Sequence, residues 1–153
     1  MASALQASGP LVFVDTGVLL AADDAHDATA QIRAREWMQA LWQHRAGRVS
    51  TQVLNAYYVA ATQIFGMPQG DARAKLRRLQ LWQPWQVDQR TLETAWGVEA
   101  RFGLPYWDAL MVASAAQSGA SHVLTTALPP QQIDGVTLLS PFLITPAELA
   151  LAG

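Results

Sequence analysis

Cysteine is absent from this 153-residue chain, which excludes disulfide bonds and thiolate metal sites. Charged residues are also scarce, at 14% against 51% hydrophobic residues, and the net charge is −2. This composition indicates a folded protein and argues against a strongly basic nucleic-acid binder, although a local basic groove is compatible with it. No apolar run approaches the roughly 20 residues that a membrane span needs, so we expect no membrane partner.

The first ten residues, Met1–Pro10, have neither the basic start nor the long apolar stretch of a signal peptide. We therefore expect a loose N-terminal arm and a cytoplasmic protein. The length fits one domain that can bury a core, and no internal repeat or long linker divides it. The prediction is a single domain over residues 1–153.

The segment Leu11–Leu20, LVFVDTGVLL, is the centre of the predicted fold. Its apolar start is typical of a buried parallel strand, and a turn at Thr16 and Gly17 leads into a helix. Asp15 therefore lies at the carboxyl end of a strand, where open α/β sheets bind their ligands. It is a candidate metal ligand or general base, and the alternative is that Asp15 and Thr16 only cap the following helix.

The rest of the chain alternates between helical and strand-like segments. This alternation predicts an α/β fold, a three-layer α/β/α sandwich around a parallel sheet of four or five strands. The expected helices are Ala28–Arg45, Thr51–Phe65, Gln69–Leu81, Thr91–Phe102 and Ala109–Ser118, and the later strands are Val49, an edge strand Trp82–Val87, His122–Thr125 and Val136–Leu139. The expected apolar stripe of the first long helix is Ile32, Trp37, Leu41 and Trp42, and the expected core includes Val12, Val14, Leu54, Leu110, Val112, Ala113 and Val123.

Three polar segments are further candidate sites. The loop Ala21–Asp27 holds Asp23, Asp24, His26 and Asp27, which is either a metal cluster or a solvated loop that ends in a helix cap. A carboxylate also opens the apolar helix at Asp108, where packing does not explain it but the helix dipole would. The third segment is a solvated basic face or a set of RNA-phosphate contacts, and its residues are Arg73, Lys75, Arg77 and Arg78.

Four segments together resemble the PIN domain family, and in particular the VapC-type toxin ribonucleases of toxin–antitoxin systems. They occur in the order and spacing of that family and, with the helices between them, span about residues 11–142. The segments are FVDTGVLL at 13–20, STQVLNAYYV at 50–59, YWDALMVASAAQSGASHVLTTAL at 106–128 and IDGVTLLSPF at 133–142.

The resemblance implies an endoribonuclease that uses Mg²⁺ or Mn²⁺, with Asp15 and Asp108 matching two of the four acidic site positions of the family. Hard cations of this kind take carboxylate oxygens, and they activate water and neutralise charge in phosphodiester hydrolysis. The resemblance also implies a homodimer and an antitoxin protein as a partner.

The other two acidic positions depart from the family, because this chain has Ala56 and Ala127 there. Asn55 does not replace the first, since neighbouring helix residues point about 100° apart. Thr16, Thr125 and Thr126 are possible neutral oxygen ligands, and the loop acids Asp23, Asp24 and Asp134 are of unknown reach. The two alanines are compatible with neutral substitution in an alanine-rich chain. They are also compatible with deliberate inactivation of a toxic nuclease.

Three functions are compatible with this pattern. The first is a PIN protein with a degenerate acidic site, natural or engineered, in which a metal binds weakly or not at all and RNA cleavage is weak or absent. The second is an active Mg²⁺-dependent endoribonuclease toxin that uses Asp15 and Asp108, because Mg²⁺ is often held by one or two carboxylates. The third is a non-catalytic module that binds RNA or a partner protein through apolar patches, to which six tryptophans would contribute.

Overall fold

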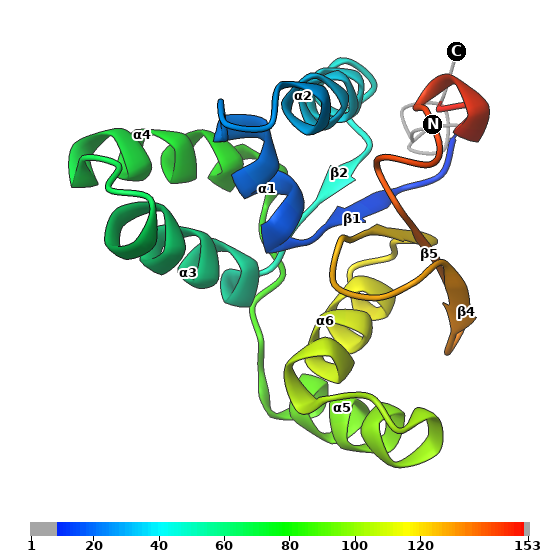
Figure 1. Cartoon of the computed structure of the whole chain (residues 1–153). Helices are drawn as coiled ribbons and strands as arrows, with labels where there is room; N and C mark the ends of the chain where they lie inside the picture. Colours follow the sequence, from blue (N-terminus) through cyan, green and yellow to red (C-terminus); the bar gives the residue numbers. More distant parts are fainter. Residues whose placement is uncertain (1–8, 152–153) are drawn as a thin grey trace, which may run out of the picture.

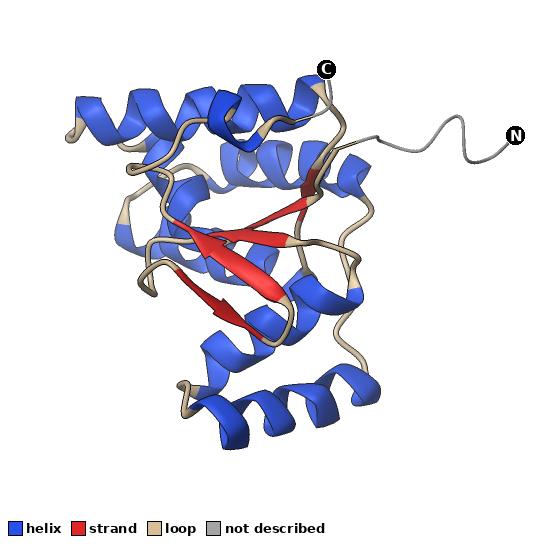
Figure 2. Cartoon of the chain, turned by 90° about the vertical axis from the view of Figure 1, so that its right-hand side faces the viewer, coloured by secondary structure: helices blue, strands red, loops and turns tan. Residues whose placement is uncertain are grey.

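The computed structural model describes residues 9–151, so most of the expected N-terminal arm lies outside the described residues. A five-stranded sheet has the order β2-β1-β3-β5-β4, in which β4 is antiparallel to β5 and all other neighbours are parallel. The sandwich expected from the sequence is confirmed, since helices lie on both sides of the strands (Figures 1 and 2). The strands are β1 (Val12–Val14), β2 (Gly47–Arg48), β3 (His122–Leu124), β4 (Gln131–Ile133) and β5 (Val136–Leu139).

Residues 9–151 contain six α-helices, of which α5 and α6 lie on one side of the sheet and α1 and α2 on the other (Figure 1). None of the helices described over residues 9–151 is long and apolar enough to cross a bilayer. The helices are α1 (Thr16–Asp23), α2 (Ala28–Gln43), α3 (Thr51–Val59), α4 (Gln69–Leu79), α5 (Gln89–Phe102) and α6 (Tyr106–Gln117). Shorter helical segments are a π-helix η2 (Ala60–Ile64) that continues α3, and the 3-10 turns η3 (Gln80–Trp82) and η4 (Ala147–Leu149).

The core lies where β1 and β3 meet α6. All three residues of β1 are fully buried, and so are seven residues of α6, which is apolar nearly all round. This burial on both faces explains why β1 has no polar position until Asp15. Six of the seven expected core residues are buried, and Leu54 is only partly buried because Val53 and Tyr57 form the buried stripe of α3.

Three expectations on local structure are wrong. Trp82–Val87 is not a strand, because Pro84 cannot donate to a ladder and only Trp85 makes an isolated bridge, with Ser50. No strand was expected between His122–Thr125 and Val136–Leu139, but this part of the chain contains β4, which the tight turn at Asp134 and Gly135 joins to β5. Ile32 is 68% exposed, because it lies two residues, about 200°, from Ala34 on the buried stripe of α2.

Candidate functional site

Asp15 lies between β1 and α1, so it is at the carboxyl end of a strand and also caps the following helix. Its Oδ1 accepts a 2.7 Å hydrogen bond from the backbone N–H of Thr16 and thereby caps α1. Its Oδ2 accepts a 2.7 Å hydrogen bond from the hydroxyl of Thr125, which follows the neighbouring strand β3. The carboxylate is therefore held in one orientation by the ends of two parallel strands.

Asp108 reaches the same place from the first turn of α6. This helix starts after Pro105 and is buried from Ala109 to Ala115, which fixes the position of its partly exposed first turn. One cleft of about 960 Å³ is lined by both carboxylates. The sequence-predicted residues that line it are Asp15, Thr16, Ala56, Asp108, Thr126 and Ala127.

The electrostatics of the pair follow from burial and from the like charge. Burial raises the pKa of Asp15, although the hydrogen bonds from Thr125 and Thr16 act in the opposite direction. Burial also raises the pKa of Asp108, and the neighbouring charge of Asp15 adds to this effect. Among residues 9–151, neither carboxylate takes part in an ion pair with Lys, Arg or His.

The turn after β1 is closed by a small residue. A Cβ at Gly17 would overlap the hydroxyl oxygen of Thr126, so only glycine permits this contact without rearrangement. Thr125 lies behind the carboxylate, and its hydroxyl also accepts the N–H of Ala127 at 3.0 Å. Thr125 therefore orders the segment that carries the second alanine of the site.

Two polar residues of α3, Gln52 and Asn55, also line the cleft. Asn55 donates to the backbone oxygen of Thr51 at 3.0 Å, so its amide is engaged locally. Gln52, which the sequence analysis did not single out, donates to the backbone oxygen of Trp107 at 3.2 Å. Its Oε1 is buried without a hydrogen-bond partner in the described part of the chain. No sequence signal marks Gln52, because its partner lies 55 residues away.

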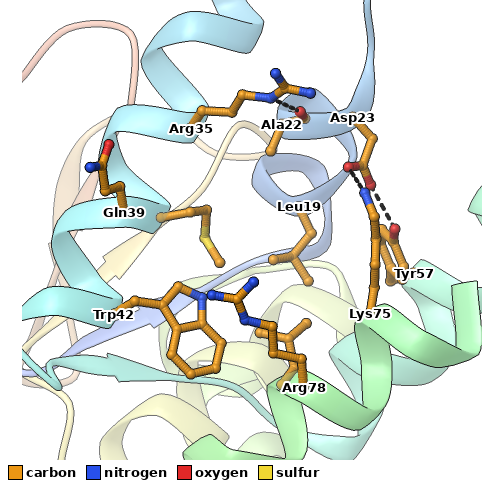
Figure 3. A pocket seen from close by; sticks show the side chains of 11 residues that line it. Leu19, Ala22, Asp23, Arg35, Gln39, Trp42, Tyr57, Lys75 and Arg78 are labelled. Carbon is orange, nitrogen blue, oxygen red and sulfur yellow. Dashed lines mark hydrogen bonds and ion pairs between the residues drawn. The ribbon is translucent and has the colours of Figure 1, made fainter. Parts of the chain in front are cut away.

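The four basic residues of α4 do not line the carboxylate cleft. Lys75 forms an ion pair with Asp23, and Arg78 lies over the ring of Trp42 at 4.9 Å in a separate cleft between α1, α2 and α4 (Figure 3). Arg73 donates to the hydroxyl of Tyr58 at 3.2 Å. Contact of Arg73, Lys75, Arg77 and Arg78 with RNA phosphates stays a prediction.

The loop acids have structural partners rather than a metal-like arrangement. Asp24 contacts His26 at 3.1 Å, and Asp27 caps α2 through the N–H of Ala30 at 3.1 Å. Asp134 pairs with Arg101 at 2.8 Å. Across residues 9–151, no group of three or more His, Asp or Glu residues is placed to hold a metal ion.

The donor set in the carboxylate cleft nevertheless fits one hard cation. Asp15 and Asp108 supply two carboxylates without a competing cationic side chain, and the hydroxyls of Thr16 and Thr126 line the same cleft. Mg²⁺ is commonly held by one or two carboxylates and keeps several waters, so two acids suffice for a weak site.

Comparisons with known proteins define the class of this fold. The family model described as PIN domain matches residues 12–126, and the chain therefore belongs to the PIN domain family. Among solved structures, it is similar to VapC20 of Mycobacterium tuberculosis, a toxin that cleaves the sarcin-ricin loop. That match has a TM-score of 0.55 and 22% identity, and covers 73% of this chain and 86% of that chain. No curated protein sequence matches significantly.

Proposed function

We propose that this chain is a VapC-type PIN protein whose ribonuclease centre is degenerate, so that it binds Mg²⁺ or Mn²⁺ weakly and cleaves RNA weakly or not at all. The observation that carries the proposal is that Ala56 and Ala127 line the same cleft as Asp15 and Asp108. Both alanines therefore lie where additional carboxylates would face a cation held by the acid pair. Their methyl groups leave space in the cleft but contribute no ligand and no charge.

The roles of the remaining residues follow from their contacts. Asp15 would hold the cation, with its carboxylate oriented by Thr125 and by the N–H of Thr16. Asp108, which lines the same cleft, would hold it as well. Burial raises the pKa of both acids, and the charge of Asp15 adds to this effect at Asp108, so a bound cation would favour their ionised forms. When bound, the cation supplies positive charge that stabilises the phosphodiester during hydrolysis and lowers the pKa of water.

The experiment restores the missing charge with the double substitution Ala56→Glu and Ala127→Asp. More anionic ligands hold a cation more tightly, so we expect the restored variant to bind Mn²⁺ more tightly than the present chain. The measurement is isothermal titration with Mn²⁺, together with cleavage of a mixed RNA pool in Mg²⁺ or Mn²⁺. An EDTA sample controls for metal-independent degradation.

A matched variant, Ala56→Gln with Ala127→Asn, adds side chains of similar size without charge. It separates the effect of charge from the effect of filling the cleft. Equal cleavage by the present chain and the restored variant, with loss of activity on Asp15→Asn, would contradict the degenerate site and favour the active toxin. Absence of cleavage by every variant would leave a purely binding role.

A second candidate function, binding of an antitoxin-like partner protein, is favoured by the cleft of Figure 3. Its walls are apolar at Leu19, Met38 and Leu79, while Arg35 and Arg78 lie at its rim. This combination suits a helix that presents apolar and acidic side chains. Pull-down with the purified chain should recover a partner that Met38→Asp loses and that Ile32→Asp, on the exposed side of the same helix, retains.

A further inference from the structure

A third cleft begins at the amino ends of β2 and β3 and extends along β2 to Trp85, which bridges Ser50 beyond the end of that strand. Short segments connect the end of α2 to the start of β2 and the end of α6 to the start of β3, and they lie at the amino ends of these strands. Gly47 pairs with Val12, at the start of β1, whereas Asp15 follows the end of that strand. None of the described residues that line this cleft also lines the carboxylate cleft. This amino-edge cleft has a volume of about 760 Å³ and is lined mainly by Trp42, Arg45, Arg48, Trp82, Gln83 and Trp85.

Three indole rings form one wall of the amino-edge cleft. Trp42 and Trp82 have ring centroids 4.9 Å apart, and Trp82 packs on Gly47, where a Cβ would overlap its ring. Trp85 is fixed on both sides: its indole N–H donates to the hydroxyl of Thr91 at 3.0 Å, and its backbone N–H donates to Val49 at 2.9 Å. Trp82 is buried, whereas Trp42 and Trp85 remain partly exposed. The ring of Trp42 already contacts Trp82 and Arg78, so Trp85 offers the accessible aromatic surface.

The cationic side chains of the amino-edge cleft lack acidic partners. Arg45 and Arg48 line it, and no Asp or Glu is among the described residues that do. Arg48 donates only to the neighbouring backbone oxygen of Gly47, at 2.8 Å, and within residues 9–151 Arg45 makes no side-chain hydrogen bond or ion pair. The guanidinium of Arg78 lies on the ring of Trp42, but Arg78 lines the cleft of Figure 3 and not the amino-edge cleft.

The backbone around the amino-edge cleft holds two polar side chains at strained positions. Arg45 and Gln83 have φ values of 53° and 52°, in the left-handed region that glycine and asparagine occupy at lower cost. Both residues follow the end of a helical segment, and both line this cleft. A long cation and an amide at these two positions are not explained by helix termination alone, since smaller residues would serve that role.

We propose that the amino-edge cleft is a nucleotide-binding site. A base stacks on the exposed indole surface of Trp85, and its phosphate contacts Arg45 and Arg48. Aromatic stacking beside unpaired cations is the combination that holds single-stranded nucleic acid without dependence on base identity. The ligand is a nucleoside phosphate, either as a unit of an RNA strand or as a free nucleotide. This site does not depend on the chemistry of Asp15 and Asp108.

The test measures binding in EDTA, so that no cleavage occurs and failure of the carboxylate site has no effect on the result. The probe is a fluorescein-labelled oligoadenylate of about eight nucleotides, titrated by fluorescence anisotropy at low salt. We expect the double variant Arg45→Ala with Arg48→Ala to weaken binding about tenfold or more. The slope of log K against log salt should fall by about 1.4, which corresponds to two phosphate contacts on a single strand.

The matched control removes two positive charges elsewhere, with Arg33→Ala and Arg90→Ala, neither of which lines this cleft. It should retain affinity to within about twofold, because it changes net charge but no contact. Equal losses in both double variants would overturn the proposal in favour of unspecific attraction. Absence of binding by the unsubstituted chain would overturn it as well.

The aromatic wall is tested separately with Trp85→Leu and Trp85→Phe. Loss of one stacked base should weaken binding about five- to a hundredfold in Trp85→Leu, and Trp85→Phe should recover most of it because it keeps a ring. Melting curves select variants that remain folded, and unchanged affinity in a folded Trp85→Leu would contradict the stacking. Competition with AMP identifies the source: displacement by AMP supports a free nucleotide, whereas displacement by longer strands alone supports RNA.

Discussion

The hydroxyl of Thr125 holds the carboxylate of Asp15 through a 2.7 Å hydrogen bond between the ends of two adjacent parallel strands. Thr125 is itself buried, and its oxygen accepts the N–H of Ala127, so one hydroxyl serves two segments of the site. It stabilises the ionised form of an acid that burial pushes towards the neutral form.

Thr125→Val should therefore raise the pKa of Asp15 further. It should also cost about 1–3 kcal/mol of folding free energy, because a buried acceptor and the N–H of Ala127 lose their partner. The pKa is measured from the carboxyl carbon shift of Asp15 in NMR spectra recorded against pH. Thr125→Ser keeps the hydroxyl and serves as the control; an unchanged or lower pKa in Thr125→Val would show that this bond has no influence.

The acid pair also predicts a pH-dependent stability. The pKa values of Asp15 and Asp108 are raised above the value of 3.8 expected in the unfolded chain, so the folded state holds these protons more tightly. The stability from the neutral carboxyls is present below pH 3.8 and is lost as the pH rises through the folded pKa values. Asp108→Asn should therefore stabilise the metal-free protein at pH 7 and give no such gain below pH 3.8.

Urea denaturation with EDTA at both pH values measures this difference. Glu93→Gln removes an exposed acid from α5 as the matched control, and it should show no comparable change with pH. A gain of equal size for Asp108→Asn at both pH values would show that the gain does not come from ionisation of Asp108.

The buried face of α6 predicts a large cost for truncation at Leu110. This side chain is 3% exposed, so Leu110→Ala should reduce the free energy of unfolding by about 2–5 kcal/mol. Ile32→Ala removes a similar side chain from an exposed position and should change stability by less than about 0.5 kcal/mol. Denaturant titration compares the two, and a loss below about 1 kcal/mol at Leu110 would mean that the site repacks around the cavity.

A homodimer is the expected state of the protein in solution. The exposed apolar side chains Ile64 and Phe65, 74% and 57% exposed at and after the end of η2, lie near the carboxylate cleft and suit a protein contact. Light scattering should give twice the mass of one chain, and Ile64→Asp should lower it to the mass of one. A single-chain mass across a wide concentration range, without any substitution, would contradict the dimer.

The central part of the fold and the acid pair could be predicted from the sequence because both follow from short-range patterns. An all-apolar strand that ends in Asp15 and an apolar helix that begins near Asp108 suffice to place both acids at the carboxyl edge. The positions of Ala56 and Ala127 came from the resemblance to PIN domains, and the structure brings both residues to the same cleft.

The remaining features depend on contacts that no local pattern carries. The exposure of Ile32 depends on which side of α2 meets the sheet, and β4 is recognisable only once β5 is available as its partner. The π-helix after Val59 widens α3 at a point where the sequence continues in ordinary helical periodicity. The amino-edge cleft collects Trp42, Trp85 and Ser118 from segments far apart in the chain, so its composition becomes visible only in three dimensions.

The short edge strands of the sheet restrict how copies of this protein can associate. On one side, β2 has only two residues, and the bridge from Ser50 to Trp85 covers the backbone beyond it. On the other side, β4 has three residues, of which Gln131 and Gln132 are exposed and polar. Neither border offers a long apolar template for another strand, so the sheet resists growth into extended fibrils. Helical surfaces such as the one that carries Ile64 and Phe65 then remain for self-association, and a single charge placed there opposes it.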